Sequence, residues 1–240
     1  MKVKNRLLNY SGYYIYQDTD FFKMSLDSVL LANFVTINLR DKNIIDLATG
    51  NAPIPMFLSF RTKAHIYGVE LQKEIFDLGI KSVNENNMNE QIDLINADVN
   101  NLYSRFKSDF FDVITCNPPY FRTNNDAFVN NSLIKAKARH EKTLSFEDVC
   151  KISRYLLRTN GRLAIIHRTE RLMEIVDIMK SYDIEPKKIR FVYPNHKKDS
   201  DLVLIEGVKG GRTGLKLLSP LFVYDKKDIY SDEVRSMFGE

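Results

Sequence analysis

The stretch Asn43-Ile-Ile-Asp-Leu-Ala-Thr-Gly-Asn-Ala-Pro53 decides the fold of this chain. Its first five residues are a short apolar run that predicts a buried strand over 43–47. Gly50 can take a positive φ without steric cost, so it ends the strand in a tight turn. Pro53 suits the first turn of a helix, where its missing N–H costs nothing. The stretch therefore predicts a strand–turn–helix unit that carries an acidic residue, Asp46, close to the end of the strand.

Strands and helices alternate beyond this unit. Such alternation implies a parallel sheet with right-handed crossovers and helices on both faces. The last two strands have no helix-length gap between them, which implies an antiparallel hairpin at one edge. The predicted fold is α/β, with a seven-stranded, mostly parallel sheet. Its further strands are expected at 65–70, 91–96, 110–116, 161–167, 188–193 and 201–207, and its helices at 72–86, 145–158 and 170–180.

Two segments flank this core. An amphipathic helix is expected over 28–39, after the aromatic segment Tyr13-Tyr-Ile-Tyr16, and a short tail follows the sheet at 217–224 and 231–238. We expect an N-terminal extension (1–40) and a C-terminal tail (211–240) to pack on a central domain (41–210), giving one globular unit.

The composition is that of a soluble globular protein. Of 240 residues, 44% are hydrophobic and 28% are charged, which excludes a disordered chain. The apolar runs are far shorter than the roughly 20 residues that a membrane span needs, and no signal-peptide core follows the N-terminus. We expect a cytoplasmic monomer without a metal site, in which Cys116 and Cys150 are buried thiols.

Three carboxylates close three successive predicted strands: Asp46, Glu70 and Asp98. Each alone is more typical of a solvated strand end. The carboxyl ends of parallel strands meet at one edge of the sheet, where ligands of such folds bind. Glu70 is placed to accept hydrogen bonds from both ribose hydroxyls, as the acidic residue of dinucleotide sites does. Together the three acids indicate a ligand that carries several hydroxyl and amino donors.

Asn117-Pro-Pro-Tyr120 ends the fourth strand at the same edge. The motif can be interpreted as a rigid turn or as a binding site for an amino group. An exocyclic amino group of adenine is a poor nucleophile, because its lone pair is delocalised into the ring. The Asn117 side-chain oxygen and the Pro118 carbonyl can accept its two hydrogens and so direct the lone pair at a methyl donor, while Tyr120 stacks on the base. Alignment and oriented dipoles would then supply catalysis without a strong general base.

These motifs resemble those of class I methyltransferases. Asp46 to Ala52 resembles their acidic-x-Gly-x-Gly-x-Gly loop, although only Gly50 is kept and Ala48 and Ala52 replace glycines. The order of motifs along the chain is similar to that of bacterial tRNA methyltransferases that modify N6 of adenine 37, beside the anticodon of a valine tRNA. The last of these motifs runs from Pro194 to Gly211. The supporting motifs are Phe22-Lys-Met-Ser-Leu-Asp-Ser-Val-Leu-Leu-Ala32, Asn117-Pro-Pro-Tyr120, Ala138-Arg-His-Glu141 and Pro194-Asn-His-Lys197.

The resemblance implies S-adenosylmethionine as cofactor and tRNA as partner. Lys23 and Asp27 would then pair with the carboxylate and the ammonium of the methionine end. The catalytic residues would be Asn117, Pro118 and Tyr120. The cofactor-binding residues would be Lys23, Ser25, Asp27, Asp46, Ala48, Thr49, Gly50, Asn51, Glu70, Leu71, Asp98, Val99 and Asn117. The substrate-binding residues would be Pro119, Tyr120, Phe121, Arg122, Arg139, His140, Lys197, Lys209 and Arg212.

The distribution of charge favours the C-terminal edge as the RNA surface. Residues 187–216 carry eight basic and three acidic side chains, a net charge of +5, whereas the whole chain has +4. This segment includes Lys209-Gly-Gly-Arg212, a basic loop of the kind that binds phosphates. A charge run of this kind is otherwise usually a solvated face.

Other functions remain open at this stage. Asn-Pro-Pro-Tyr also serves enzymes that methylate a glutamine amide in proteins, although those carry a helical domain before the cofactor loop and only 45 residues precede Asp46 here. DNA methyltransferases usually carry an added recognition region, for which the chain has little room. The missing glycines also leave open an RNA-binding module with a vestigial cofactor fold. A dehydrogenase is disfavoured, because its fingerprint needs three glycines at fixed spacing.

Overall fold

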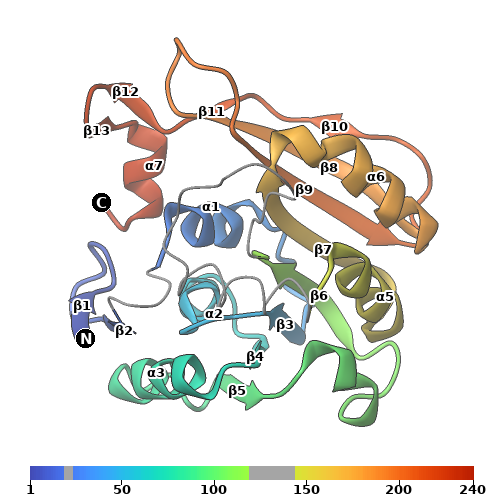
Figure 1. Cartoon of the computed structure of the whole chain (residues 1–240), viewed down its shortest axis with the longest axis horizontal. Coiled ribbons are helices and arrows are strands. Elements are labelled where there is room, and N and C mark those ends of the chain that lie inside the picture. Colours follow the sequence, from blue (N-terminus) through green and yellow to red (C-terminus); the bar gives the residue numbers. More distant parts are fainter. Residues whose placement is uncertain (19–23, 119–143) are drawn as a thin grey trace, which may run out of the picture.

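A computed structural model describes residues 1–18, 24–118 and 144–240 (Figure 1). Its central sheet confirms the expected α/β fold. The seven expected strands lie in the order β8-β9-β7-β6-β3-β4-β5, and all are parallel except β9, which runs antiparallel to both of its neighbours. They are β3 (Asn43–Leu47), β4 (His65–Glu70), β5 (Ile92–Asn96), β6 (Phe111–Cys116), β7 (Leu157–Arg168), β8 (Ile184–Tyr193) and β9 (Leu202–Lys209).

Within the described residues the sheet has nine strands, where seven were expected. Two short strands of the C-terminal tail, β10 (Lys216–Leu217) and β11 (Leu221–Phe222), pair in parallel with β8. The β8–β9 hairpin is antiparallel as expected, but β9 inserts between β7 and β8. The tail pairs along β8 and so covers a strand edge that would otherwise be exposed.

Apolar side chains cover both faces of the sheet, as a parallel sheet requires. Ile44 points into one hydrophobic cluster and its neighbour Ile45 into the other, because successive strand residues face opposite ways. On the first face the sheet is covered by α1 (Leu26–Phe34), α2 (Pro53–Ser59) and α3 (Lys73–Glu85). On the second it is covered by η1 (Val99–Ser104), α5 (Phe146–Leu156) and α6 (Leu172–Ser181), which follows η2 (Thr169–Arg171).

Two expected signals at helix starts are confirmed. Pro53 begins α2. Ser145 and Asp148 form a reciprocal capping box at the start of α5, with Ser145 Oγ accepting from the Asp148 N–H at 3.1 Å. Cys116 and Cys150 are both buried thiols, as expected.

The helix expected over 28–39 is shorter, because α1 ends at Phe34. The chain leaves the helix where Thr36 donates both its backbone N–H and its hydroxyl to the Glu206 carboxylate, at 2.6 and 2.7 Å. A charged acceptor on β9 therefore outweighs the continuation of the helix.

A hairpin that the sequence did not predict opens the chain. Strands β1 (Lys2–Arg6) and β2 (Tyr14–Asp18) pair antiparallel. Side chains satisfy the outer edge of β2: Asn86 exchanges two hydrogen bonds with the Tyr14 backbone, at 2.8 and 2.7 Å. Ser82 Oγ accepts from the Tyr16 N–H, and Asn51 donates to the Tyr16 carbonyl. Short polar side chains of α3 and of the loop after β3 thus act in place of a neighbouring strand.

The C-terminal tail continues through β12 (Tyr224–Lys226), β13 (Ile229–Tyr230) and α7 (Asp232–Met237). The Val223 N–H donates to the Tyr193 carbonyl at the end of β8, and the Asn9 N–H donates to the Phe238 carbonyl. Both chain ends therefore meet on one side of the molecule (Figure 1). The division at residues 40 and 210 stays a prediction.

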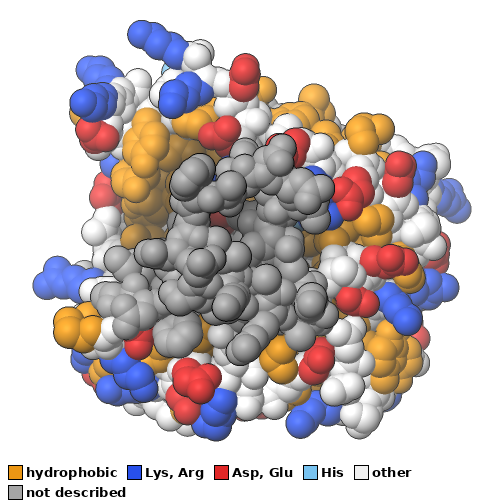
Figure 2. Space-filling view, in the orientation of Figure 1, with side chains coloured by type: hydrophobic (Ala, Val, Ile, Leu, Met, Phe, Trp, Pro, Cys, Tyr) orange, Lys and Arg blue, Asp and Glu red, His pale blue; other side chains and the backbone are white. Residues whose placement is uncertain are grey.

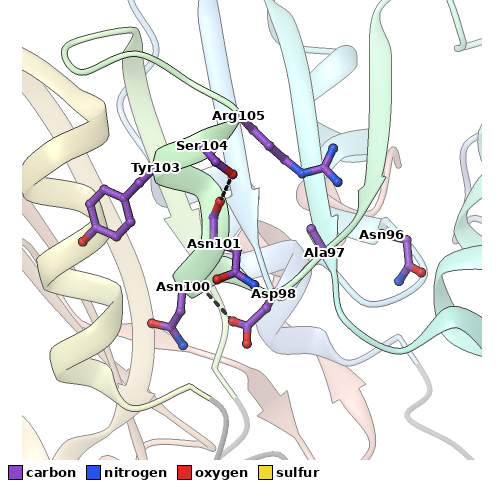
Figure 3. A pocket seen from close by; sticks show the side chains of 8 residues that line it. All are labelled: Asn96, Ala97, Asp98, Asn100, Asn101, Tyr103, Ser104 and Arg105. Carbon is purple, nitrogen blue, oxygen red and sulfur yellow. Dashed lines mark hydrogen bonds between the residues drawn. The ribbon is translucent and has the colours of Figure 1, made fainter.

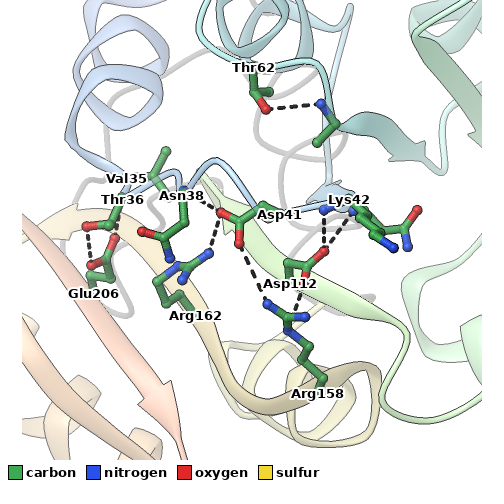
Figure 4. A network of polar contacts seen from close by, with 12 residues as sticks. Val35, Thr36, Asn38, Asp41, Lys42, Thr62, Asp112, Arg158, Arg162 and Glu206 are labelled. Atoms are coloured by element: carbon green, nitrogen blue, oxygen red, sulfur yellow. Dashed lines mark hydrogen bonds and ion pairs between the residues drawn. The ribbon is translucent and has the colours of Figure 1, made fainter.

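A buried network of hydrogen bonds and ion pairs lies at the edge of the sheet where the parallel strands begin (Figure 4). Arg162 on β7 donates to the fully buried Asp41 at 2.6 Å. Asp112 on β6 accepts from the backbone of Lys42 and from Arg158, at 2.6 and 2.7 Å. The network joins the chain before β3 to β6 and β7, so it fixes where the central strand enters the sheet.

Removal of Arg162 is expected to destabilise the protein strongly. Arg162→Met removes the cation that is hydrogen-bonded to the buried Asp41 carboxylate and leaves only the Arg158 guanidinium, 3.8 Å away, so the cost should approach about 3–5 kcal/mol, that of a broken buried pair. Lys73→Met is the control, since Lys73 and its partner Asp77 are both exposed and the loss of such a surface pair should cost about 1 kcal/mol or less. Urea unfolding of both variants measures the difference, and equal costs would contradict the assignment.

Candidate active site

The register of three central strands brings the predicted site residues together at the edge of the sheet where the parallel strands end. Asp46 on β3 lies level with Gly68 on β4 and Thr115 on β6. Leu47 lies level with Cys116, so Asn117 follows β6 at the height of Ala48. The structure therefore brings the start of the Asn-Pro-Pro-Tyr motif beside the start of the loop that follows β3, as the sequence predicted from strand order alone.

The Asp46 carboxylate is fully buried at this edge. The Thr115 hydroxyl donates to its Oδ1 at 2.7 Å. Burial raises the pKa of Asp46 to about 7, although this hydrogen bond opposes the shift. The Thr49 hydroxyl also lowers that pKa, but neither Thr49 Oγ1 nor Asp46 Oδ2 makes a hydrogen bond of normal geometry with the described residues. Buried polar atoms in this state suit a ligand that supplies the missing partner.

The loop after β3 keeps a glycine-rich conformation although it contains one glycine. Ala48, Gly50 and Ala52 all have left-handed φ, at 53°, 62° and 69°. This region costs a residue with a Cβ roughly 1–2 kcal/mol. The two alanines that replace glycines therefore keep the backbone conformation that glycines would adopt. The replacement adds conformational strain to the loop without changing its backbone path.

Two glycines outside the loop lie where a side chain would be crowded, and no sequence motif marks them. A Cβ on Gly68 of β4 would lie 2.6 Å from Leu94 and 3.0 Å from Thr49. A Cβ on Gly79 of α3 would lie 2.9 Å from Leu94 and 3.4 Å from the backbone of Asn51. The Leu94 side chain is the nearest neighbour at both positions, and the loop itself comes close only at Gly68, through Thr49.

Glu70 ties the loop to the end of β4. Its two carboxylate oxygens accept from the N–H groups of Gly50 and Gln72, at 2.9 and 2.8 Å. The side chain is almost wholly buried, and burial raises its pKa. A carboxylate has about four acceptor positions, so these two bonds leave room for ribose hydroxyls. The neighbouring Leu71 is 41% exposed at the same strand end and offers an apolar surface.

Asp98 lines an open pocket of about 550 Å³ beyond β5 (Figure 3). Its carboxylate caps η1 by accepting from the Asn100 N–H at 2.8 Å. Val99, also expected at the site, is buried beneath it. Most of the other lining side chains are polar: Asn96, Asn100, Asn101, Tyr103, Ser104 and Arg105. The pocket therefore suits a ligand with several hydrogen-bonding groups.

The start of α1 adjoins the end of β6. Asn117 Nδ2 donates to Ser28 Oγ at 3.5 Å, and Ser28 is buried. Ser25 is the N-cap residue of α1 and Asp27 lies in its first turn, so the structure brings the pre-loop segment to this edge. The role of Ser28 was missed, although it directly follows the predicted contact residue Asp27.

Several expected site residues lie outside the described residues: Lys23, Pro119, Tyr120, Phe121, Arg122, Arg139 and His140. Their roles stay predictions.

The expectation for Lys209 is wrong. Its side chain is buried, and its ammonium donates to the Leu157 carbonyl and the Asp109 carboxylate, at 2.6 and 2.9 Å. Because β9 runs antiparallel, Lys209 lies at the edge where β6 and β7 begin, opposite Asn117. Arg212 is exposed but follows at that same far edge. Lys197 is exposed in the β8–β9 turn, at the edge where β8 ends.

The fold and this edge define the class of protein: a class I methyltransferase. A solved structure of a predicted O-methyltransferase from Agrobacterium tumefaciens has a TM-score of 0.71 at 22% identity, covering 89% of this chain and 95% of that one. A geranyl diphosphate C-methyltransferase from Streptomyces coelicolor has a TM-score of 0.56 at 11% identity, covering 76% of this chain and 79% of that one. Both likenesses show the fold.

The family follows from the sequence match. Residues 21–182 match the model described as methyltransferase small domain, and the chain belongs to this family. Similar curated proteins include two named tRNA1(Val) (adenine(37)-N6)-methyltransferase. That of Flavobacterium psychrophilum is 24% identical, with 76% of this chain and 77% of the relative covered. That of Aliivibrio salmonicida is 26% identical, with 76% of each covered.

Family membership indicates S-adenosylmethionine as the methyl donor, as the sequence led us to expect. The residues present fit this cofactor. Asp46 Oδ2 and Thr49 Oγ1 are buried polar atoms without a normal hydrogen bond among the described residues, and the cofactor offers an ammonium and hydroxyls. When bound, it supplies an electrophilic methyl group.

Among residues 1–18, 24–118 and 144–240, the His, Cys, Asp and Glu side chains form no group that could hold a metal ion. No described helix is long and apolar enough to cross a membrane.

Replacing Ala48 by glycine is expected to stabilise the protein. Glycine removes the left-handed strain at this half-buried position, so the free energy of unfolding should rise by about 0.5–1 kcal/mol. Ala52→Gly should gain less, because it also removes a fully buried methyl group worth about 0.8 kcal/mol. Urea unfolding checks both variants, and a loss of stability in Ala48→Gly would refute the strain.

The raised pKa of Asp46 predicts a pH dependence of folding. The native state holds this proton more tightly than the unfolded state, whose aspartate pKa is near 3.8. Its stabilising effect is fully present below that value and is lost as the pH rises through about 7, at up to about 1.4 kcal/mol per pH unit. Urea unfolding from pH 5 to 8 should show this decline relative to Asp46→Asn, and parallel curves would contradict it.

Proposed function

We propose that this methyltransferase modifies N6 of an adenine in tRNA, namely adenine 37 beside the anticodon of a valine tRNA. The observation that carries the proposal is the position of Asn117 at the height of Ala48, where β6 ends beside the cofactor loop. The relatives named tRNA1(Val) (adenine(37)-N6)-methyltransferase support the choice of substrate.

In this proposal the cofactor lies along the ends of β3, β4 and β5. Asp46 and Thr49 bind its ammonium end, with Lys23, Ser25 and Asp27 nearby. Glu70 accepts from the ribose hydroxyls, as the carboxylates of nucleotide sites do. Asp98 accepts from the adenine amino group, while Leu71 and Val99 pack against the ring. Ala48, Gly50 and Asn51 pass the backbone close to the ligand.

Asn117 and Pro118 orient the amino group that is methylated. The hydrogen bond from Asn117 Nδ2 to Ser28 turns the amide nitrogen toward α1 and so sets the direction of its Oδ1. That oxygen and the Pro118 carbonyl accept the two amino hydrogens, which directs the nitrogen lone pair toward the methyl group. Tyr120 stacks on the base, with Pro119 and Phe121 beside it. Arg122, Arg139, His140 and Lys197 bind the RNA backbone, whereas Arg212 is left out because it follows β9 at the opposite edge.

Asn117→Ala should abolish most activity. We expect a decrease of about 10²–10³-fold in methyl transfer, the usual effect of removing one hydrogen bond aimed at developing charge, which should exceed the loss in cofactor affinity. Asn89→Ala removes an exposed asparagine before β5 and serves as the matched control. Methyl transfer from labelled S-adenosylmethionine to unmodified tRNA measures activity, and calorimetry measures cofactor binding.

The substrate arms of this experiment separate the candidate functions. A valine tRNA transcript with adenine 37 should accept label as N6-methyladenosine, whereas the same transcript with guanine 37 should not. Label that resists nuclease but is removed by protease would refute tRNA as substrate and favour a glutamine methyltransferase. Absence of cofactor binding by calorimetry would instead favour a vestigial RNA-binding module.

A further inference from the structure

The N-terminal hairpin has two chemically different faces. Directly opposed residues of an antiparallel pair point the same way, so the pairings Lys2–Asp18, Lys4–Tyr16 and Arg6–Tyr14 place these side chains on one face. The intervening β2 residues Ile15 and Gln17 are buried in the protein. The outward face therefore carries Lys2, Lys4 and Arg6 in a row, with two tyrosine rings beside them.

The charges on this outward face are only partly neutralised. Lys4 pairs with Glu85 and lies 4.0 Å from the centre of the Tyr14 ring. Asp18 pairs with the N-terminal amine at 2.6 Å. Lys81 of α3 lies 4.0 Å from the centre of the Tyr16 ring and adds another cation. Lys2 and Arg6 are exposed and have no ion-pair partner among the described residues. The face thus keeps a positive excess with aromatic side chains between the charges.

The hairpin is rigidly connected to the cofactor loop. Asn51 of that loop donates to the Tyr16 carbonyl at 2.8 Å, while Asn86 and Ser82 hold the same strand on α3. Lys and Arg side chains also project from the left flank of the face seen in Figure 2, on the side where Figure 1 draws β1 and β2. A ligand bound to the outward face would therefore have a fixed position relative to the methyl-transfer site.

We propose that the outward face of the β1–β2 hairpin binds the sugar–phosphate backbone of the RNA substrate. This inference rests on the proposed function. Successive cations on one face of a strand are about 6.6 Å apart, and such a row suits a chain with one negative charge per nucleotide. A protein partner is less suited, because the outward face offers charge and tyrosine but no aliphatic patch.

The burial of other basic residues strengthens this assignment. In the C-terminal segment that the sequence favoured, Lys188 bonds to the Phe34 carbonyl and pairs with Glu206. Arg190 pairs with Glu233, and Lys209 with Asp109. Lys187 donates to the Arg212 carbonyl at 3.0 Å. Four of the eight basic side chains therefore contact internal acceptors, which leaves the hairpin a larger share of the accessible positive charge.

Charge reversal on the hairpin tests the proposal. The variant Lys2→Glu with Arg6→Glu should weaken binding of unmodified tRNA by about tenfold or more and reduce the slope of log affinity against log salt by about 1–2. Lys4 is left intact because it pairs with Glu85. The matched control is Lys63→Glu with Lys107→Glu, two exposed lysines in the loops that precede β4 and β6.

Cofactor affinity, measured by calorimetry, should be unchanged in both double variants. If the hairpin variant folds poorly, Lys2→Ala with Arg6→Gln gives the same comparison at lower cost to folding. Equal tRNA affinity and salt slope in the hairpin and control variants would overturn the proposal. If the unaltered protein does not bind or methylate tRNA, the proposed function fails instead, and a protein ligand of the hairpin becomes the alternative.

Discussion

The alignment of β3 with β4 and β6 is the constraint on which the rest of the structure depends. Because the three strands are parallel and their register is fixed, Asp46, Glu70 and Asn117 all come to the same edge. The apolar side chains on both faces of β3 hold this register, since a slip by one residue would move Asp46 to a different height and expose the core. The positions of the site residues at the strand ends therefore follow from the apolar packing around β3.

The two edges of the sheet differ in what their buried carboxylates contact. Where the strands begin, Asp41 and Asp112 are paired with arginines and accept from backbone N–H groups, although Asp41 Oδ1 makes no hydrogen bond among the described residues. Where they end, Asp46 and Thr49 keep buried oxygens without normal hydrogen bonds among the described residues. The carboxylates of the first edge are neutralised by arginines. Asp46 has no cationic partner among the described residues, so the second edge suits a ligand that carries an ammonium group.

Strain and close packing shape the loop that crosses this second edge. Ala48 and Ala52 adopt backbone angles that favour glycine, while Gly68 leaves room for the Thr49 side chain. The loss of glycines from the motif therefore does not imply the loss of the backbone path that the cofactor needs.

The sequence by itself determined the order of strands and helices, the α/β class and the acids at the strand ends, because these depend on local periodicity and on the direction of parallel strands. It could not reveal the β1–β2 hairpin, which is held by Asn51, Ser82 and Asn86 far along the chain. Nor could it show that Lys209 is buried and faces the opposite edge, since net charge along a chain carries no information about strand direction or pairing in space. Residue types and local order predicted the chemistry of the site. Only the tertiary contacts decided which charges are accessible.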